Sequence, residues 1–377
     1  MEEKSSKAKG VSIVMILLAI VLGFGFVIGL TQTSAANNLT NKDSEISNYA
    51  FDENGVLLSY SGQQTEIEIP ATYSLSSTVE QVEMSSSSIY TLVDRASSLG
   101  ILNYSIENQT GNYTDEYGNV YYQEKYVMTY EKRKVVEGDD YQVTGIAANA
   151  FSNNTRITSI TIPETVRTIG SNSFAGCTNL KTVVLPEYLD RIEDSAFYNC
   201  RMLREIEIPN TVSYIGSQAF YYCSSLQQIN IPTNITTIYQ ATFFQCYNLK
   251  EVVIPSNVRN IQPEAFYGCT SLEKLTLNEG LVSISSGAFY NCYNLVEIEL
   301  PTTVNNLTNS AFYRCTNLQT VVIKSPNIVN ISSNTFPTSI MNIYVRDELL
   351  ADYPNYSYWY NYTHCLRPLS EWINNAQ

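Results

Sequence analysis

Apolar and polar positions repeat along most of this chain with a constant step of 23 residues. Phenylalanine stands at 151, 174, 197, 220, 243, 266, 289 and 312, and cysteine at 177, 200, 223, 246, 269, 292 and 315. Aligned on phenylalanine, the unit reads AFxxCxxLxxIxIPxxVxxIGxx. Such a period indicates stacked supersecondary units that bury their apolar side only against neighbouring units.

The LxxIxIP part of each unit predicts one short strand. Apolar residues alternate there with period two, and the proline ends the strand because it cannot donate to a parallel ladder. The VxxI that follows and the next Ala-Phe supply further inward groups, so we expect strands of successive coils to stack in parallel. The register predicts that these positions and their equivalents are buried: Phe197, Cys200, Leu203, Ile206, Ile208, Val212 and Ile215.

These units resemble a leucine-rich repeat of the bacterial BspA-like, or Treponema-type, variant, whose repeats read LxxIxIPxxVxxIGxxAFxxCxxL. The resemblance covers Phe151 to about Ile331 in eight units, with Asn278 and Lys324 in place of proline and Asn154 in place of cysteine. It implies an α/β repeat fold: a leucine-rich-repeat solenoid with one short parallel strand per 23-residue coil. It also implies a bacterial cell-surface protein, since several members of this family are adhesins that bind host or neighbouring-cell proteins.

The first coil is split by an insertion. Residues 66–70 read as a strand with its proline, and 143–151 supply the other half of the coil. The phenylalanine follows that proline by 81 residues instead of 11, so about 70 residues are inserted. Within them, 86–99 predicts a capped amphipathic helix, and 101–107 and 120–130 predict strands. We expect a small α+β insert that packs on the N-terminal end of the solenoid.

The C-terminal segment predicts a second cap. Residues 343–345 give a last strand, and the resemblance implies that a helix and aromatic side chains after it cover the final coil. The apolar residues available for this are Leu349, Leu350, Tyr353, Trp359 and Tyr362. The predicted organisation is therefore a membrane or signal segment at 1–36, a linker at 37–60, an N-terminal cap with the split repeat and insert at 61–140, the solenoid at 141–336 and the C-terminal cap at 337–377.

The N-terminal region predicts a membrane segment. Residues 11–30 carry no charge, a length that lets a helix cross about 30 Å of hydrocarbon, and Lys4, Lys7 and Lys9 mark the cytoplasmic side. Small residues such as Ala35 also suit a signal peptidase, so a cleaved signal remains the alternative to a retained anchor. We expect a single-pass cell-membrane protein with a cytoplasmic N-terminus and an extracytoplasmic C-terminal region, or a secreted one.

Composition excludes several functional classes. The one histidine, His364, leaves no Ser/His/Asp or Cys/His pair and no multi-histidine metal site. A net charge of −14 repels phosphate backbones, and no phosphate-binding glycine motif is present. We therefore expect no nucleic acid, nucleotide, metal or other cofactor as a partner.

The cysteine series raises the question of disulfides, because exported proteins usually meet an oxidising compartment. Coils stack about 4.8 Å apart, which a disulfide can span. Equivalent side chains in a stack nevertheless all point into the core rather than toward each other. We predict that most of the eight cysteines are free thiols packed as small apolar groups.

Two outward-facing series are candidates for binding. On the strand face, carboxylates alternate with apolar residues, and we place the interaction surface on Val184, Glu205, Glu207, Glu251, Val253, Glu297, Glu299 and Val322. On the turn side, the residue after each core phenylalanine gives an aromatic ladder, namely Tyr198, Tyr221, Phe244, Tyr267, Tyr290 and Tyr313. We expect these rings mainly to stack on one another, the alternative being a grip on a sugar or protein partner.

An elongated repeat with variable outward positions favours a membrane-anchored, surface-exposed protein that binds an extracellular protein or an envelope component, and not an enzyme. One alternative is an envelope hydrolase whose chemistry lies in the insert or on the pairs Glu205/Glu207 and Glu297/Glu299, since two carboxylates on one face can act as acid and base. The other alternative is a structural envelope spacer. A convergent polar pocket would favour the hydrolase, and a smooth face would favour binding.

Overall fold

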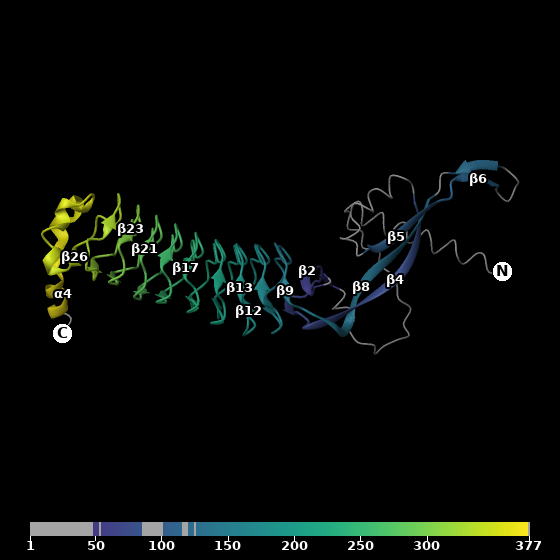
Figure 1. Cartoon of the computed structure of the whole chain (residues 1–377), viewed down its shortest axis with the longest axis horizontal. Coiled ribbons are helices and arrows are strands. Elements are labelled where there is room, and N and C mark those ends of the chain that lie inside the picture. The colour runs from purple at the N-terminus through teal and green to yellow at the C-terminus, as the bar shows by residue number, and fades with distance from the viewer. Residues whose placement is uncertain (1–47, 53, 85–100, 115–119, 124–125, 376–377) are drawn as a thin grey trace. The chain divides into compact units, whose positions relative to one another are not determined.

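The computed structural model describes residues 48–52, 54–84, 101–114, 120–123 and 126–375 (Figure 1). The predicted helix at 86–99 and the predicted membrane segment at 11–30 lie outside this range. The described residues divide into two compact units. One spans Tyr73–Asp140, and the other combines Asn48–Thr72 with Tyr141–Gln377.

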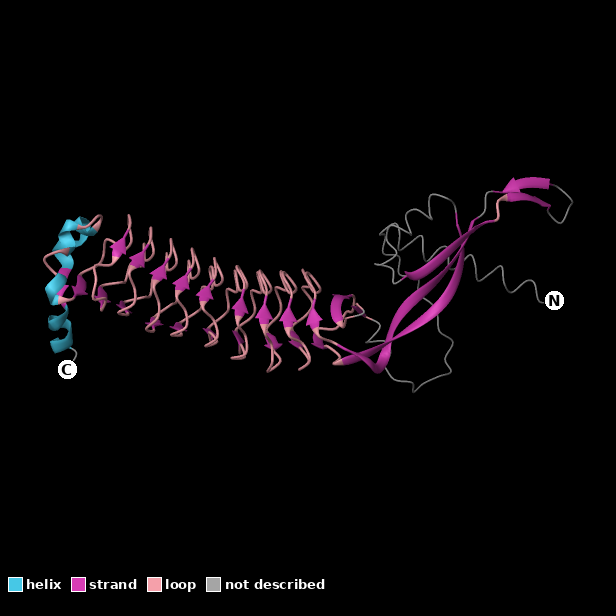
Figure 2. Ribbon diagram, viewed as in Figure 1, coloured by secondary structure: helices cyan, strands magenta, loops and turns pink. Residues whose placement is uncertain are grey.

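The second unit is a solenoid of stacked coils, each formed by one repeat of the sequence, and the predicted fold class is confirmed. The LxxIxI segments form a first sheet: β3 (Glu66–Glu68), β10 (Ser159–Thr161), β12 (Thr182–Val184), β14 (Glu205–Ile206), β16 (Gln228–Ile229), β18 (Glu251–Ile254), β20 (Lys274–Leu277), β22 (Glu297–Leu300), β24 (Thr320–Ile323), β26 (Asn342–Val345) and β27 (Leu366–Pro368). Figure 2 shows a second strand in each coil of the solenoid.

This second strand comes from the VxxI segment, so the prediction of one strand per coil was incomplete. The second sheet contains β1 (Tyr49–Phe51), β2 (Val56–Tyr60), β9 (Gly145–Ile146), β11 (Thr168–Ile169), β13 (Arg191–Ile192), β15 (Tyr214–Ile215), β17 (Thr237–Ile238), β19 (Asn260–Ile261), β21 (Ser283–Ile284), β23 (Asn306–Leu307) and β25 (Asn330–Ile331). From β9 on, its strands have two residues each, too few to show an alternating pattern in the sequence.

Successive strands pair in parallel with the register of the repeat. Ile160 faces Val183, and Ile261 faces Ile284, so each residue lies opposite the equivalent residue of the next coil. Because each residue stacks on its own equivalent, an inward position remains inward in every coil. The seven representative positions from Phe197 to Ile215 are at most 4% exposed, which confirms the predicted register.

Phenylalanine and cysteine ladders fill the interior. From Phe151 to Phe312 the consecutive rings stack with centroids 5.0–5.6 Å apart. Each cysteine Sγ from Cys177 to Cys315 donates to the phenylalanine carbonyl oxygen 26 residues earlier, at 3.0–3.4 Å. All eight cysteines are buried and free, as predicted.

The N-terminal edge of the solenoid differs from the prediction, which assigned 37–60 to a linker. Strands β1 and β2 pair antiparallel, and β2 pairs in parallel with β9, with Leu57 opposite Ile146. Leu57 is fully buried, so residues 49–60 belong to the fold. Strands β3 and β9, which lie on either side of the insert in the sequence, stack on β10 and β11 respectively.

The described part of the insert consists of strands: β4 (Thr72–Met84), β5 (Ile101–Asn108), β6 (Gly111–Thr114), β7 (Val120–Gln123) and β8 (Tyr126–Gln142). Strands β4, β8 and β5 form a sheet in that order, with β5 antiparallel to β8, and β6 and β7 form an antiparallel pair. The predicted strands at 101–107 and 120–130 match β5, β7 and the start of β8. Packing of the insert on the solenoid stays a prediction.

The C-terminal cap contains short helices and one strand more than predicted. The helical elements are η2 (Asp347–Leu349), η3 (Tyr353–Asn355), η4 (Trp359–Cys365) and α4 (Leu369–Asn375). Strand β26 is not the last, because β27 pairs with it in parallel. The buried Trp359 donates from Nε1 to the carbonyl oxygen of Val329 at 2.8 Å, which fixes the cap to the final coil.

Candidate binding surface

The strand face, defined as the outward residues of the first sheet, holds the eight residues predicted to form the interaction surface. Among them, Val184 and Val253 are 50% and 45% exposed, a large apolar area to leave in water. The carboxylates Glu205, Glu207, Glu251 and Glu297 are exposed, and Glu299 is partly exposed. These seven residues lie where the sequence predicts.

The prediction that Val322 belongs to the interaction surface was wrong, because this residue is fully buried. Its partner in the next strand is Tyr344, which is 8% exposed. Helix α4 packs against β26 and β27, and Trp372 on this helix lies under the ammonium of Lys324, 5.8 Å from the ring centroid. The C-terminal cap therefore folds back over the last strands and withdraws Val322 from the binding surface.

The first sheet is interrupted between β20 and β22. In the coils before and after this point, two backbone N–H groups donate to one carbonyl: Glu273 and Lys274 to Lys250, at 2.9 and 3.2 Å, and Gln319 and Thr320 to Val296, at 2.9 and 3.3 Å. Within the described solenoid, no such bond joins Val296 or Glu297 to Glu273. Across the interruption these groups therefore lack the backbone bond that their equivalents form.

The first sheet is also divided between β12 and β14 and between β16 and β18, although at β16/β18 the Lys250 N–H still donates to the Gln227 carbonyl at 3.3 Å. Two of the three Glu-x-Glu segments of the first sheet begin directly after the breaks at β12/β14 and β20/β22, at Glu205 and Glu297, four coils apart; the third is Glu66–Glu68 in β3. Neither Glu205 nor Glu207 forms an ion pair with a described residue. Acidic side chains thus stand next to unpaired backbone at two places on one face.

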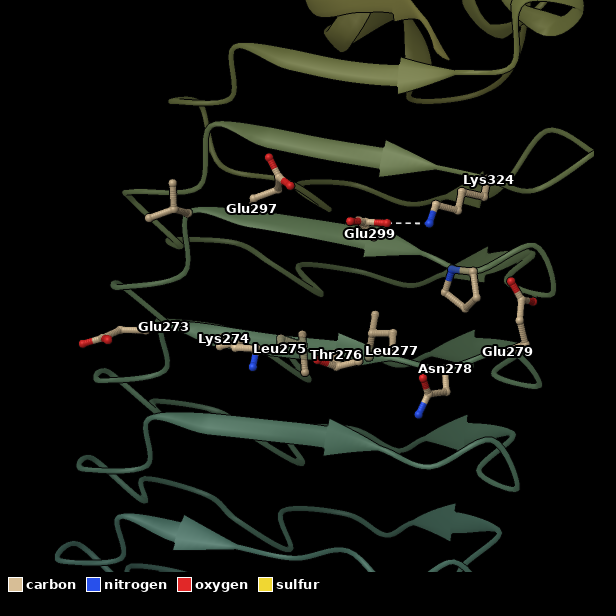
Figure 3. A pocket seen from close by; sticks show the side chains of 12 residues that line it. Glu273, Lys274, Leu275, Thr276, Leu277, Asn278, Glu279, Glu297, Glu299 and Lys324 are labelled. Atoms are coloured by element: carbon tan, nitrogen blue, oxygen red, sulfur yellow. Dashed lines mark ion pairs between the residues drawn. The ribbon is translucent and has the colours of Figure 1, made fainter. Parts of the chain in front are cut away.

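A hollow of about 600 Å³ opens at the break between β20 and β22. We call it the strand-face hollow, lined by Glu273, Lys274, Leu275, Thr276, Leu277, Asn278, Glu279, Val296, Glu297, Glu299, Pro301 and Lys324. Figure 3 shows that its residues come from successive rungs of the first sheet and the turns after them. Its volume is within the range of about 300–1,000 Å³ that small-ligand sites occupy.

The lining carries four carboxylates and two lysines, and both lysines are already paired. Lys274 Nζ lies 2.5 Å from Glu251 Oε1 on the preceding rung, and Lys324 Nζ lies 2.5 Å from Glu299 Oε2, the pair drawn with a dashed line in Figure 3. Glu297 has no cationic partner among the described residues. The hollow therefore holds an excess of negative charge with a carboxylate that is free to bind.

Two carboxyl groups of the hollow have shifted pKa values. Burial and then the neighbouring charge of Glu299 raise the pKa of Glu297. For Glu279, burial acts in the raising direction, but hydrogen bonds from Thr302 lower the pKa overall. The Thr302 hydroxyl donates to Glu279 Oε2 at 2.7 Å and its N–H to Oε1 at 3.1 Å, so Glu279 is held in place while Glu297 is not.

The hollow bears on the hydrolase alternative, since it places Glu297 and Glu299 in one cavity. A general acid and base need different environments that push their pKa values apart. Here one carboxylate is tied to Lys324 and both remain in contact with solvent. The arrangement suits the attraction of a positive group better than proton transfer.

The turn-side aromatic ladder is confirmed as a stack. From Tyr198 through Phe244 to Tyr290, ring centroids are 4.5–4.8 Å apart and the rings are within 8° of parallel. Tyr313 departs from the stack, with its ring tilted by 58°. Because the ring faces are used for this stacking, mainly ring edges are left for a ligand.

Comparisons with known proteins address identity. A family profile described as the BspA type leucine-rich repeat region, in six copies, matches residues 144–272 and 236–363, more than half of the chain. The chain belongs to this family. The match to BspA-type leucine-rich repeat proteins that was recognised from the sequence is confirmed. No curated protein sequence matches the chain.

Solved structures include similar leucine-rich repeat proteins. One from Bacteroides ovatus is 23% identical, with a TM-score of 0.46, over 64% of this chain and 71% of that one. A leucine-rich cell surface protein from Faecalibacterium prausnitzii is 18% identical, with a TM-score of 0.37, over 79% and 86%. The leucine-rich repeat protein of T. pallidum is 18% identical, with a TM-score of 0.33, over 84% and 95%.

The described residues show neither a membrane-spanning helix nor a cluster of metal-binding side chains. None of the helices in this part of the chain is long and apolar enough to span a membrane. The same residues contain no group of three or more histidine, cysteine, aspartate or glutamate side chains arranged to hold a metal ion. The membrane segment at 11–30 remains a prediction from the sequence.

Sequence reasoning missed the strand-face hollow and its lysines. One signal was present, because the two of the eight repeat units that lack the strand-ending proline carry Asn278 and Lys324 there, and both residues line the hollow. A departure from the repeat thus marked the site. The interruption of the ladder itself has no counterpart in the repeat pattern.

Proposed function

We propose that this BspA-type protein binds a protein partner through its strand face, held at the cell surface by the N-terminal segment 11–30. The observation that carries the proposal is the contrast within each strand of the first sheet. Inward residues repeat from coil to coil, whereas outward residues differ and combine carboxylates with exposed valines. Rigid, varied and partly apolar surfaces of this kind suit protein recognition.

The charge of the face indicates the partner. The whole chain has a formal net charge of −14, and the Glu-x-Glu segments concentrate acid on this surface. Basic patches on a partner would be steered toward it. Raising the salt concentration should weaken binding, because it shortens the Debye length below its physiological value of about 8 Å and screens this attraction. The proposed partner is an extracellular or envelope protein with a basic binding surface.

The test starts with capture of partners by the chain from Asn37 onward, against host extracellular and bacterial envelope proteins. Binding is then compared in two variants: Glu205, Glu207, Glu297 and Glu299 changed to Lys, and Tyr198, Tyr221, Tyr267 and Tyr290 changed to Ser. The first should lower the association rate by roughly tenfold or more, with unchanged far-ultraviolet circular dichroism. Loss of binding in the tyrosine variant alone would show that the turn side is the binding face.

A charge-matched control separates local contacts from overall charge. Glu187, Asp190, Glu264 and Glu348 are exposed and lie outside the strand face, and their change to Lys alters the net charge by the same amount. This control should retain most of the binding. Equal losses in both sets would mean that net charge alone drives association and would overturn the assignment to the strand face.

A further inference from the structure

The strand-face hollow is the part of the proposed surface with the most specific chemistry. Three independent features meet there: a cavity, an interrupted backbone ladder, and a carboxylate without a cationic partner at Glu297 among the described residues. A second hollow, next to Tyr60 and Ser152–Arg156, has less than half the volume, about 290 Å³.

The chemistry of the hollow selects a cation on a flexible apolar stem. Val296 is 52% exposed and borders the cavity together with Leu275 and Leu277, which gives a partly apolar floor. Lysine and arginine side chains bury their methylene groups on such surfaces while the charged end reaches a polar group. A free anion would meet the negative excess of the lining and be repelled.

The lysines that line the hollow do not neutralise Glu297. Lys274 is directed to Glu251, and Lys324 to Glu299, so the described part of the chain supplies no cation to Glu297. An arginine from outside would find the Glu297 carboxylate and the Glu273 carbonyl, which accepts no backbone bond from Val296 or Glu297. Arginine has five donors and can satisfy both kinds of acceptor.

We infer that the strand-face hollow seats a lysine or arginine side chain of the protein partner, with Glu297 as its counter-ion. This inference rests on the proposed function and sharpens it to one position on the face. Glu299 and Glu279 keep their present contacts with Lys324 and Thr302 and shape the walls of the site.

The test uses the full chain in detergent micelles, with ¹³C-labelled valine and leucine methyl groups. The probe is the blocked peptide acetyl-Arg-Arg-Arg-amide, and its neutral counterpart contains citrulline in place of arginine. Methyl signals of Val296, Leu275 and Leu277 report on the hollow, and those of Val184, on an earlier coil of the same face, serve as an internal reference. The arginine peptide should shift the signals of the hollow and leave Val184 unchanged, and the citrulline peptide should shift neither.

Two variants assign the effect. Glu297→Gln removes the charge at nearly constant shape and should weaken peptide binding roughly tenfold, the loss of one charge-assisted contact. Glu187→Gln makes the same change of charge on an exposed residue outside the strand face and should leave the affinity within about twofold. An unchanged affinity in Glu297→Gln, or shifts produced by calcium ions but not by the arginine peptide, would overturn the inference.

Partner binding separates failure of this inference from failure of the proposed function. If the four-glutamate variant loses the partner while Glu297→Gln does not, and the peptide leaves Val296 unchanged, the hollow is not the seat but the strand face still binds. If the peptide fills the hollow while the partner ignores every change on the strand face, the hollow does not seat the partner, and the proposed face is also wrong.

Discussion

The inner and outer faces of the same coils follow different rules. Inside, Phe220 stacks between Phe197 and Phe243, so each residue packs against copies of itself. Outside, Val184, Glu207 and Val253 occupy one equivalent position and meet only water or a partner. Parallel stacking without a change of register imposes identity on one face and leaves the other free to differ.

The interruptions of the first sheet extend this comparison to the backbone. The second sheet is divided between β15 and β17 but runs unbroken from β17 to β25, while the first sheet is divided at β20/β22 over these last coils. The inner phenylalanine ladder is continuous across the break, since the ring centroids of Phe266 and Phe289 remain 5.1 Å apart. The core thus holds the coils together where the outer strands separate and open a hollow.

The largest expected effect tests the inner face with two adjacent residues. Phe243 is fully buried, whereas its neighbour Phe244 lies half-buried in the turn-side stack. Phe243→Ala should lower the free energy of unfolding by about 3–5 kcal/mol, because it removes a large side chain and leaves a cavity. Phe244→Ala removes three exposed-side ring contacts, with Tyr221, Tyr222 and Tyr267, and should cost about 1–2 kcal/mol. Urea unfolding followed by circular dichroism compares the two, and equal costs would contradict the assignment of inner and outer faces.

The second prediction concerns two valines that the sequence makes equivalent. Val322 is fully buried and Val184 is half exposed, at corresponding positions of different coils. Val322→Ala should cost about 2 kcal/mol of unfolding free energy, and Val184→Ala should cost less than about 0.5 kcal/mol. Equal small losses in urea unfolding would mean that the C-terminal cap does not cover Val322.

Much of the solenoid could be predicted because its interior obeys one short rule. Phe197, Cys200 and Ile206 are buried, and so are nearly all their equivalents, so one coil describes the next. Strands β1 and β2 escaped prediction because they lack the repeat; β1 pairs with β2, and β2 joins the solenoid by pairing with β9.

The candidate site was predicted only in part. Alternation places Glu297 and Glu299 outward correctly, because it depends on the strand alone. Alternation gives no information on a helix that returns over the sheet from a later part of the chain, and so Val322 was misplaced. The hollow depends on backbone spacing between two nearly identical coils, which their sequences do not reveal.

The cysteine ladder gives a pH-dependent prediction for the inner face. Burial raises the pKa of Cys223 from 9.0 to about 12. Between these values the unfolded state has lost the thiol proton while the folded state keeps it, so this contribution to stability falls as pH rises, and it is fully present below pH 9. Relative to Cys223→Ala, the wild type should lose about 1.4 kcal/mol of unfolding free energy per pH unit above pH 9. Urea titrations at pH 7, 9 and 10 measure this difference, and parallel pH profiles would show that Cys223 ionises in the folded state.

The smallest expected effect concerns the outer face. Lys274 and Glu251 form an ion pair across neighbouring rungs, with 67% and 49% of their side chains exposed. Solvent screens such a pair, so a double-mutant cycle with Lys274→Gln and Glu251→Gln should give a coupling of about 0.2–1 kcal/mol that decreases at high salt. Stability thus hardly constrains these outward charges, and they can vary to suit binding.

Loss of the pair should instead change the affinity of the strand-face hollow for the arginine peptide, because Lys274 lines the hollow. Glu251→Gln frees the Lys274 ammonium within the hollow and should lower this affinity. Lys274→Gln removes a competing cation and should raise it. A coupling well above the range of exposed ion pairs would show that the outer face carries stability as the inner face does, and the division of roles between them would then be wrong.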